Sequence, residues 1–252
     1  MFPKALLSVG FLLALLGSAL ALELNIARDL SLGTTQWAYS SKCSFAAPPS
    51  DAQFLKMIQV AFDDMKNAPA ASNKERSKRP NAMIGLSIGN EVYLSSSVRG
   101  TRQIIYEKAS FAGGDGTLNP ELPKKYKEVT DALAKCATPA NKQHKNQAAC
   151  GEIMSTLMWM TDNPTQSPKE LVVQPKVAAF NGKGYLPPCS PDPNNPEDVS
   201  WGCDSWTKEM GYKVVGDMSL PDEITVVGTC TGPLSLNACL TVVVDEEEIS
   251  KG

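Results

Sequence analysis

Seven cysteines, in a chain whose first residues have the pattern of an export signal, constrain this fold more than any other sequence feature. Lys4, the apolar run 5–16 and the small residues Ala19 and Ala21 predict a signal peptide cleaved after Ala21, and so a secreted, extracellular protein. Exported thiols normally pair as disulfides. Because the number of cysteines is odd, at least one must stay free, join another chain or bind something else. The cysteines are Cys43, Cys136, Cys150, Cys189, Cys203, Cys230 and Cys239.

The length of the chain predicts one domain, and its charge favours a small molecule or a protein as the partner. About 230 residues follow the signal, which is enough for a large domain that buries its own core. The 24 basic and 27 acidic side chains do not favour a broad phosphate-binding surface. Long nucleic acid is therefore a less expected partner than a small molecule or a protein. No stretch after residue 21 has the roughly 20 apolar residues that a membrane span needs.

Hydrophobic periods and turn residues predict one α/β domain over residues 50–244. An irregular arm, 22–49, precedes this domain and an acidic tail, 245–252, follows it. The segments expected inside the domain are a helix at 51–67 capped by Ser50, a solvated loop at 72–80, two strands flanking the Gly89-Asn90 turn, helices at 123–135 and 148–160, a strand within 171–180, a Pro- and Asn-rich loop at 181–202, a short helix from Cys203 to Gly211, a strand at 212–217 and a hairpin at 223–244.

Three cysteines stand in a pattern that metal chemistry would explain. Cys150-Gly151-Glu152 opens a helix after two strands, Pro188-Cys189 follows the next strand, and Cys203 opens a further helix. Zinc takes four tetrahedral ligands, and a catalytic site supplies three of them from protein. The N–H groups at the start of a helix favour the thiolate that binds metal. The sequence therefore predicts a zinc site made by Cys150, Cys189 and Cys203.

This motif and the order of elements resemble the zinc-dependent cytidine deaminase superfamily over about residues 82–216. The resemblance implies an α/β fold in which helices sandwich a mixed β-sheet, here with an N-terminal extension and a C-terminal β-hairpin. It also implies that Glu152 is the general acid/base, carrying a proton from water to the ring nitrogen and to the leaving ammonia. The expected protein is a secreted deaminase of a nucleobase, nucleoside or nucleic acid, acting as a toxin or effector.

The chain departs from the family at three points, one of which is that three thiolates leave zinc less Lewis-acidic than one histidine and two thiolates would. Thirteen residues separate Cys189 from Cys203, where the family usually has only a few. An insertion is tolerable if its ends return to one point, because doubling a loop costs only about 0.6 kcal/mol. No substrate-binding motif of the family stands out either. Ser97 and Arg99 occupy roughly the right place and are our candidates for substrate binding.

Two tryptophans near Cys203 and the single histidine are the other residues that could belong to a site. Trp201 and Trp206 flank Cys203 and can either stack on a base or pack beneath a loop. His144 is the only histidine, and its polar segment predicts a solvated surface side chain. A Ser-His-Asp or Cys-His hydrolase would have to use His144, and no nucleophile motif accompanies it. The metalloprotease motif H-E-x-x-H is absent.

Alternatively, cysteines that are neighbours in the sequence form disulfides with each other, and no cysteine binds metal. Each such bridge would stabilise the fold by roughly 2–4 kcal/mol. The bridges would be Cys136–Cys150, Cys189–Cys203 and Cys230–Cys239, with Cys43 left free. The zinc arrangement instead leaves four cysteines, which pair as Cys43–Cys136 and Cys230–Cys239. The alternative function is then a disulfide-stabilised secreted interaction protein that lacks a catalytic metal and binds a host protein.

Overall fold

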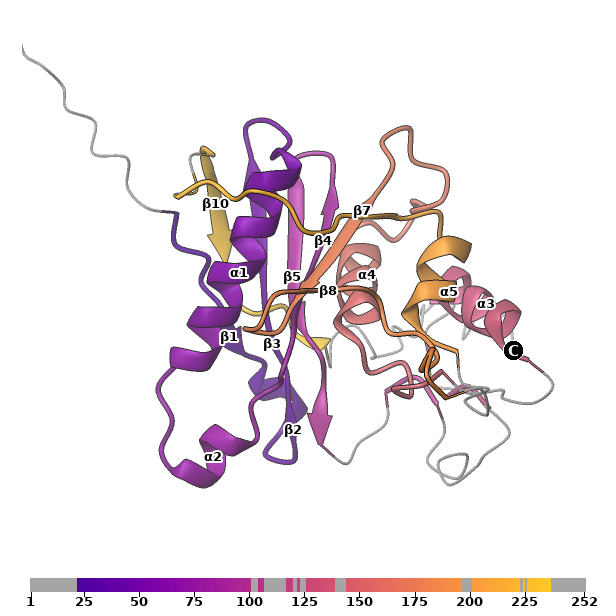
Figure 1. Ribbon diagram of the computed structural model, residues 1–252, viewed down its shortest axis with the longest axis horizontal. Helices are drawn as coiled ribbons and strands as arrows, with labels where there is room; N and C mark the ends of the chain where they lie inside the picture. Colours follow the sequence, from indigo (N-terminus) through magenta and orange to yellow (C-terminus); the bar gives the residue numbers. More distant parts are fainter. Residues whose placement is uncertain are drawn as a thin grey trace, which may run out of the picture.

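The protein is described by a computed structural model that covers two long stretches of the chain and several short ones (Figure 1). The described residues are 22–100, 104–106, 117–119, 122, 126–138, 144–195, 201–222, 224 and 226–236. The expected signal peptide, the acidic tail and the second strand of the expected C-terminal hairpin lie outside these ranges. No helix within them is long and apolar enough to cross a membrane.

A mixed sheet of eight strands forms the centre of the described structure. Four longer strands lie side by side in the order β3, β5, β4, β7, and two short strands extend each edge. All pairs are antiparallel except β7 with β9. The strands are β1 (Ala27–Arg28), β3 (Tyr39–Phe45), β4 (Met83–Ile88), β5 (Glu91–Ser96), β7 (Lys176–Phe180), β8 (Tyr185–Leu186), β9 (Lys213–Val214) and β10 (Gly228–Thr231). A separate pair joins β2 (Gln36–Trp37) to β6 (Arg99–Gly100).

The hairpin of β4 and β5 confirms the prediction of two strands around a tight turn. Ile88 pairs with Glu91, so Gly89 and Asn90 form a two-residue connection. Gly89 has φ +57°, a value that L-residues with a Cβ adopt rarely. Asn90 donates its side-chain amide to the Phe45 carbonyl at 2.8 Å, which ties the turn to β3. This hairpin supplies the two central strands of the sheet.

Helices cover both faces of the sheet, as expected (Figure 1). Helix α1 (Asp51–Asn67) packs on one face, and Ser50 caps it within a capping box completed by Gln53. Helix α4 (Gly151–Asp162) packs on the other face. Alternate residues of β4 serve the two cores: Met83 contacts the α1 side and Ile84 the α4 side. The coarse prediction of a sheet sandwiched by helices is therefore confirmed.

The remaining helices lie at the periphery of the two main layers. α3 and α5 pack against each other on the outer side of α4, so α4 is buried around almost its whole circumference. The expected solvated loop at 72–80 contains the exposed one-turn helix α2. Their bounds are η1 (Leu30–Leu32), α2 (Asn73–Ser77), α3 (Lys127–Cys136) and α5 (Cys203–Glu209).

The prediction of an irregular arm over 22–49 is wrong where β3 forms. β3 lies between β5 and the edge strands β1 and β10, and five of its seven residues, on both faces, are buried. A strand buried on both faces needs no alternation of polar and apolar residues. Ser40 and Ser41 are buried and hydrogen-bonded: Ser41 Oγ donates to the Thr231 carbonyl at 2.6 Å, and Ser40 Oγ donates to the Leu234 carbonyl at 3.4 Å. The sequence of β3 therefore shows no alternation of polar and apolar residues. Its buried hydroxyl groups form hydrogen bonds within the protein and not with solvent.

The predicted disulfides are wrong as well. Cys230 of β10 faces Cys43 of β3 and is bonded to it, which excludes both Cys230–Cys239 and Cys43–Cys136. Cys136 is a free thiol at the end of α3, and Cys239 lies outside the described residues. Nothing in the sequence marked this pair, because its members have a sequence separation of 187.

We predict that non-reducing peptide mapping will link the Cys43 and Cys230 peptides. The double substitution Cys43→Ala with Cys230→Ala should lower the free energy of unfolding by about 2–5 kcal/mol, because the bridge closes a very long loop. A map that links Cys230 to Cys239 would contradict the described pairing of β10 with β3.

We also predict that Asp51 stabilises the fold in a pH-dependent manner. Its carboxylate pairs with Lys176 at 2.6 Å and Lys213 at 2.8 Å, and these two lysines lower the pKa of Asp51 below its usual 3.8. A lowered pKa contributes stability that is present above the unfolded pKa and lost as the pH falls through the folded pKa. Asp51→Asn should cost about 1 kcal/mol at pH 7, and the difference from wild type should shrink below pH of about 4.

Urea unfolding at both pH values measures this effect. Asp131→Asn is the matched control, because Asp131 forms an exposed ion pair with Lys127 within α3. Equal pH dependence of the two variants would show that the Asp51 contacts do not stabilise the fold.

Candidate functional site

Cys150 is held at the sheet by the glycine that follows it. Cys150 is the N-cap of α4, and Gly151 is the first residue of that helix. A Cβ at Gly151 would lie 2.5 Å from Ile84 Cδ1 and 2.5 Å from the Ser95 carbonyl oxygen. Glycine therefore allows the start of α4 to pack directly on β4 and β5. This contact fixes Cys150 and Glu152 at one end of a buried helix.

A second glycine brings Cys203 beside Cys189. A Cβ at Gly202 would lie 2.1 Å from the Cys189 carbonyl oxygen and 2.8 Å from its sulfur. The Cys203 N–H, at the start of α5, donates to Cys189 Sγ at 3.2 Å, and the Asp204 N–H donates to the Cys189 carbonyl at 3.1 Å. The long insertion thus returns to its starting point, as the predicted site requires. The predicted neighbour disulfides Cys136–Cys150 and Cys189–Cys203 are not formed, since all four thiols are free.

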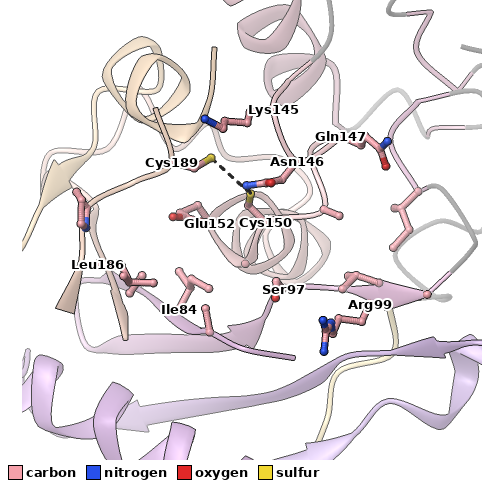
Figure 2. Close-up of a pocket in the computed structure, with 18 residues that line it drawn as sticks. Ile84, Ser97, Arg99, Lys145, Asn146, Gln147, Cys150, Glu152, Leu186 and Cys189 are labelled. Carbon is pink, nitrogen blue, oxygen red and sulfur yellow. Dashed lines mark hydrogen bonds between the residues drawn. The ribbon is translucent and has the colours of Figure 1, made fainter. Parts of the chain in front are cut away.

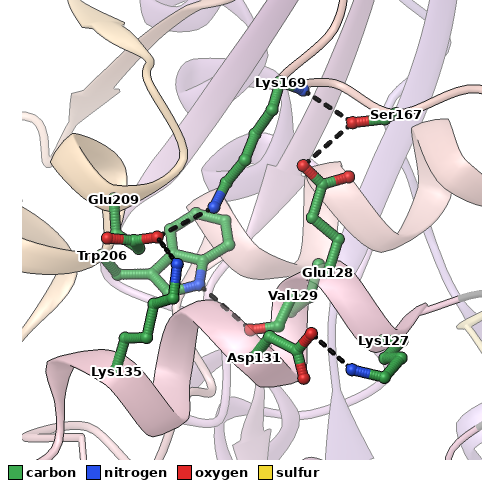
Figure 3. Close-up of polar contacts among 9 residues, drawn as sticks. All are labelled: Lys127, Glu128, Val129, Asp131, Lys135, Ser167, Lys169, Trp206 and Glu209. Atoms are coloured by element: carbon green, nitrogen blue, oxygen red, sulfur yellow. Dashed lines mark hydrogen bonds and ion pairs between the residues drawn. The ribbon is translucent and has the colours of Figure 1, made fainter.

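Contacts outside the site hold α5 in place (Figure 3). Trp206 of α5 is fully buried and donates its indole N–H to the Val129 carbonyl of α3 at 3.5 Å. Glu209, at the end of α5, pairs with Lys135 at 2.9 Å and Lys169 at 3.0 Å. Trp206 is thus a packing residue that anchors the helix on which Cys203 lies.

His144 is buried, so the prediction of a solvated surface side chain is wrong. It is 1% exposed, and its Nε2 lies 3.2 Å from Cys203 Sγ and 3.9 Å from Cys189 Sγ. Trp201 packs against it edge to face at 5.2 Å, which assigns Trp201 to packing as well. The polar residues around His144 suggested exposure, yet two of them, Asn146 and Gln147, line a cavity. No sequence signal marked His144 beyond its being the only histidine.

Backbone geometry determines which ring nitrogen of His144 carries the proton. The chain turns sharply after His144, with φ +55° at Gln147 and +56° at Ala148. This turn directs the N–H groups of Asn146 and Ala148 at His144 Nδ1, at 3.2 and 3.3 Å. A nitrogen that accepts two hydrogen bonds carries no proton, so we assign the proton of the neutral ring to Nε2, which then donates to Cys203 Sγ.

The four side chains together can hold a metal ion. One ligand atom each from His144, Cys150, Cys189 and Cys203 lies within 4.8 Å of all the others. Cys150 Sγ is 3.8 Å from Cys189 Sγ and also accepts a contact from the Asn146 amide at 3.5 Å. Thiolate and imidazole are the donors preferred by zinc and other borderline or soft metals.

Burial and mutual hydrogen bonding perturb the acidity of these groups. The pKa of Cys189 is lowered because its sulfur accepts hydrogen bonds from Cys150 and then from Cys203. Burial raises the pKa of the Cys203 thiol. A metal that binds here must therefore displace thiol protons, and its affinity will depend on pH. Burial also raises the pKa of the Glu152 carboxyl to about 7.

The sulfur cluster opens into a cavity of about 550 Å³ (Figure 2). Cys150, Glu152 and Cys189 lie on its wall, and so do both predicted substrate-binding residues, Ser97 and Arg99. Sequence reasoning missed Lys145, Asn146 and Gln147, which the turn before α4 places on the same cavity. Figure 2 shows Glu152 and Cys150 near the centre, with Arg99 and Lys145 on different sides of them.

Comparisons with protein-family models, curated proteins and solved structures found no match to this chain.

We predict that His144 supports metal binding by donating a hydrogen bond. His144→Gln places an N–H donor near the position of Nε2, so it should keep one metal per chain with nearly unchanged affinity. His144→Leu removes the donor and should weaken binding about 10- to 100-fold, as loss of a partner to a metal ligand commonly does. The absorption spectrum of the cobalt-substituted protein, with metal analysis by mass spectrometry, measures both effects.

The cobalt spectrum also tests the alternative that His144 Nε2 is a ligand. In that case both substitutions would shift the cobalt absorption bands, because both would change the coordinating atoms. Cys189→Ser is the control that should abolish tight binding in either case.

Proposed function

We propose that this protein is a zinc-dependent hydrolytic deaminase that removes an exocyclic amine from a nucleobase. The observation that carries this proposal is the position of Glu152. Its buried carboxyl, with a pKa raised to about 7, lies on the same cavity wall as Cys150 and Cys189, while Cys203 completes the group of sulfurs behind them. A metal-binding cluster, a titratable carboxyl and a cavity open to solutes are the parts that such a reaction needs.

Three thiolates from Cys150, Cys189 and Cys203 would hold the metal, as the sequence pattern predicts. When bound, zinc would act as a Lewis acid that makes water nucleophilic at neutral pH. Three negative sulfurs weaken a Lewis acid, and the Nε2–H of His144 offsets this effect by withdrawing charge from Cys203. In this arrangement His144 would be a positioning residue, and the protein would supply three of the four ligands that zinc takes.

Glu152 would move the protons of the reaction. Water attacks the ring carbon that bears the amine, so one proton must leave the water and one must reach the ring nitrogen; a second transfer then makes ammonia the leaving group. A general acid/base works best when its pKa is close to the working pH. The raised pKa of Glu152 suits both the uptake and the release of a proton near pH 7.

The cavity supports a substrate of nucleoside size. Sites for small molecules usually occupy 300–1,000 Å³, and this one has about 550 Å³. Its wall carries hydroxyl and amide groups from Ser97, Asn146 and Gln147, which can hydrogen-bond base edges or a sugar. Ile84 and Leu186 supply apolar surface on the same wall.

A closed metal site is the second candidate, favoured by the presence of four ligand-type atoms in one cluster. If His144 binds the metal, all four tetrahedral positions are filled by protein and the site is structural. The chain would then be an interaction protein stabilised by a metal and a disulfide.

Substitution of Glu152 tests the deaminase proposal. Glu152→Gln keeps the size of the side chain but cannot transfer the proton, so deamination should fall at least 100-fold while zinc content stays at one per chain. The assay should follow ammonia release from cytidine, adenosine, their nucleotides and short oligonucleotides. Glu170→Gln changes an exposed glutamate and is the matched control.

Two results would contradict the proposal. Zinc-loaded wild-type protein that releases no ammonia from any of these substrates would exclude the deaminase and favour the closed site. Full activity in Glu152→Gln would remove Glu152 from the mechanism.

A further inference from the structure

Five cations lie close together near β2 and α2, which Figure 1 shows at the same end of the molecule. We call this group the basic cluster, and it consists of Arg28, Lys66, Lys78, Arg79 and Arg99. These residues come from β1, from the C-terminal turn of α1, from the segment after α2 and from β6. They are distant in sequence, and the fold brings them together.

Specific contacts hold the basic cluster in place. Arg28 and Lys78 both lie over the Trp37 ring, at 3.4 and 5.7 Å from its centroid. Trp37 of β2 pairs with Arg99 of β6, and the Arg99 guanidinium donates to the Arg79 carbonyl at 3.1 Å. Lys66 Nζ donates to the Pro80 carbonyl at 2.6 Å. The cations are thus fixed largely by backbone carbonyls and an aromatic ring.

The basic cluster carries a surplus of positive charge. Among the described residues, Glu75 is the one carboxylate that forms an ion pair with it, at 3.7 Å from Arg28. The pKa of Lys66 is lowered by burial and, after that, by the charges of Arg99 and Arg79. The protein as a whole has a formal net charge of −3, so this region differs in sign from the molecule that carries it. An anion bound here would relieve the repulsion among these cations.

Arg99 connects the basic cluster to the cavity. Arg99 lies on the cavity wall together with Ser97 and Gly100, and the same cavity contains Cys150 and Glu152. Figure 2 shows the Arg99 side chain at the margin of the site, apart from the sulfur cluster. A ligand with its base beside Glu152 can therefore direct an attached phosphate toward Arg99.

We propose that the substrate carries phosphate: its base enters the cavity, and its phosphate is bound by Arg99, while the buried Arg79 and the other neighbouring cations add positive potential. This inference rests on the proposed deaminase function for the identity of the base, whereas the phosphate site itself rests on the basic cluster. Arg99 can pair with a phosphate through two N–H groups. Lys78 is exposed, belongs to the cluster and does not line the cavity, so it would contact a further phosphate when the substrate is a nucleic acid strand.

Binding assays test this proposal without requiring turnover. The protein is titrated against a fluorescent single-stranded 12-mer of mixed sequence, and cytidine, cytidine monophosphate, adenosine, adenosine monophosphate and inorganic phosphate are used as competitors. Arg99→Gln should weaken the binding of both monophosphates about fivefold to tenfold and leave nucleoside binding unchanged. Arg99→Lys should retain most of the affinity because it keeps the charge.

The 12-mer distinguishes a free nucleotide from a strand as the source of phosphate. Lys78→Gln should weaken the binding of the 12-mer alone among these ligands. It should also lower the salt dependence of that binding by about one phosphate contact. Lys208 is an exposed lysine of α5, and Lys208→Gln is the matched control. This variant should bind the monophosphates and the 12-mer as tightly as wild type does. Equal effects of Arg99→Gln on nucleosides and monophosphates, or no binding of any phosphate-bearing probe, would overturn the proposal.

The outcomes for the two proposals are separable. If phosphate-bearing probes bind through Arg99 and no amine is released, the phosphate site stands and the deaminase fails. If nucleosides are deaminated and phosphate adds nothing to binding, the deaminase stands and the phosphate site fails.

Discussion

The close contact between Gly202 and Cys189 is the constraint on which the candidate site depends. No side chain fits between them, because a Cβ at Gly202 would lie 2.1 Å from the Cys189 carbonyl oxygen. The N-terminus of α5 can therefore reach Cys189 and place Cys203 next to it. Gly151 has the same function at the start of α4, where the helix packs directly on the sheet. Two glycines thus fix two helix N-termini, and with them the sulfurs and Glu152.

Burial gives this arrangement its chemical character. His144, Cys150, Cys203 and Glu152 are almost completely enclosed, and a charge on any of them is costly without a partner. Burial therefore raises the pKa of Cys203 and of Glu152, while hydrogen bonds from neighbouring thiols lower the pKa of Cys189. A divalent metal would supply the compensating positive charge that the described protein groups provide only in part. The cluster thus has the donor atoms and the burial of a site that could hold a metal ion.

Overall charge proved a poor guide to the surface of this molecule. A slightly acidic composition argues against a broad phosphate-binding surface. That argument uses the net charge of the whole chain and says nothing about where the charges lie. The fold nevertheless collects five cations from separate segments around Trp37 and Arg99. Electrostatic attraction falls off within about 10 Å at ordinary salt, so a ligand responds to the local cluster and not to the net charge.

The sequence by itself determined the local elements and the order of the cysteine motif. Helical spacing and a capping serine located α1, alternation around Gly89-Asn90 located β4 and β5, and the Cys150 motif marked the start of α4. Only the tertiary structure decided the strand at β3, the Cys43–Cys230 pair and the burial of His144, which the sequence argument assigned differently. The physical reason is that periodicity reports a segment's own exposure pattern. Pairing, burial and charge clustering depend on which distant segments pack against it.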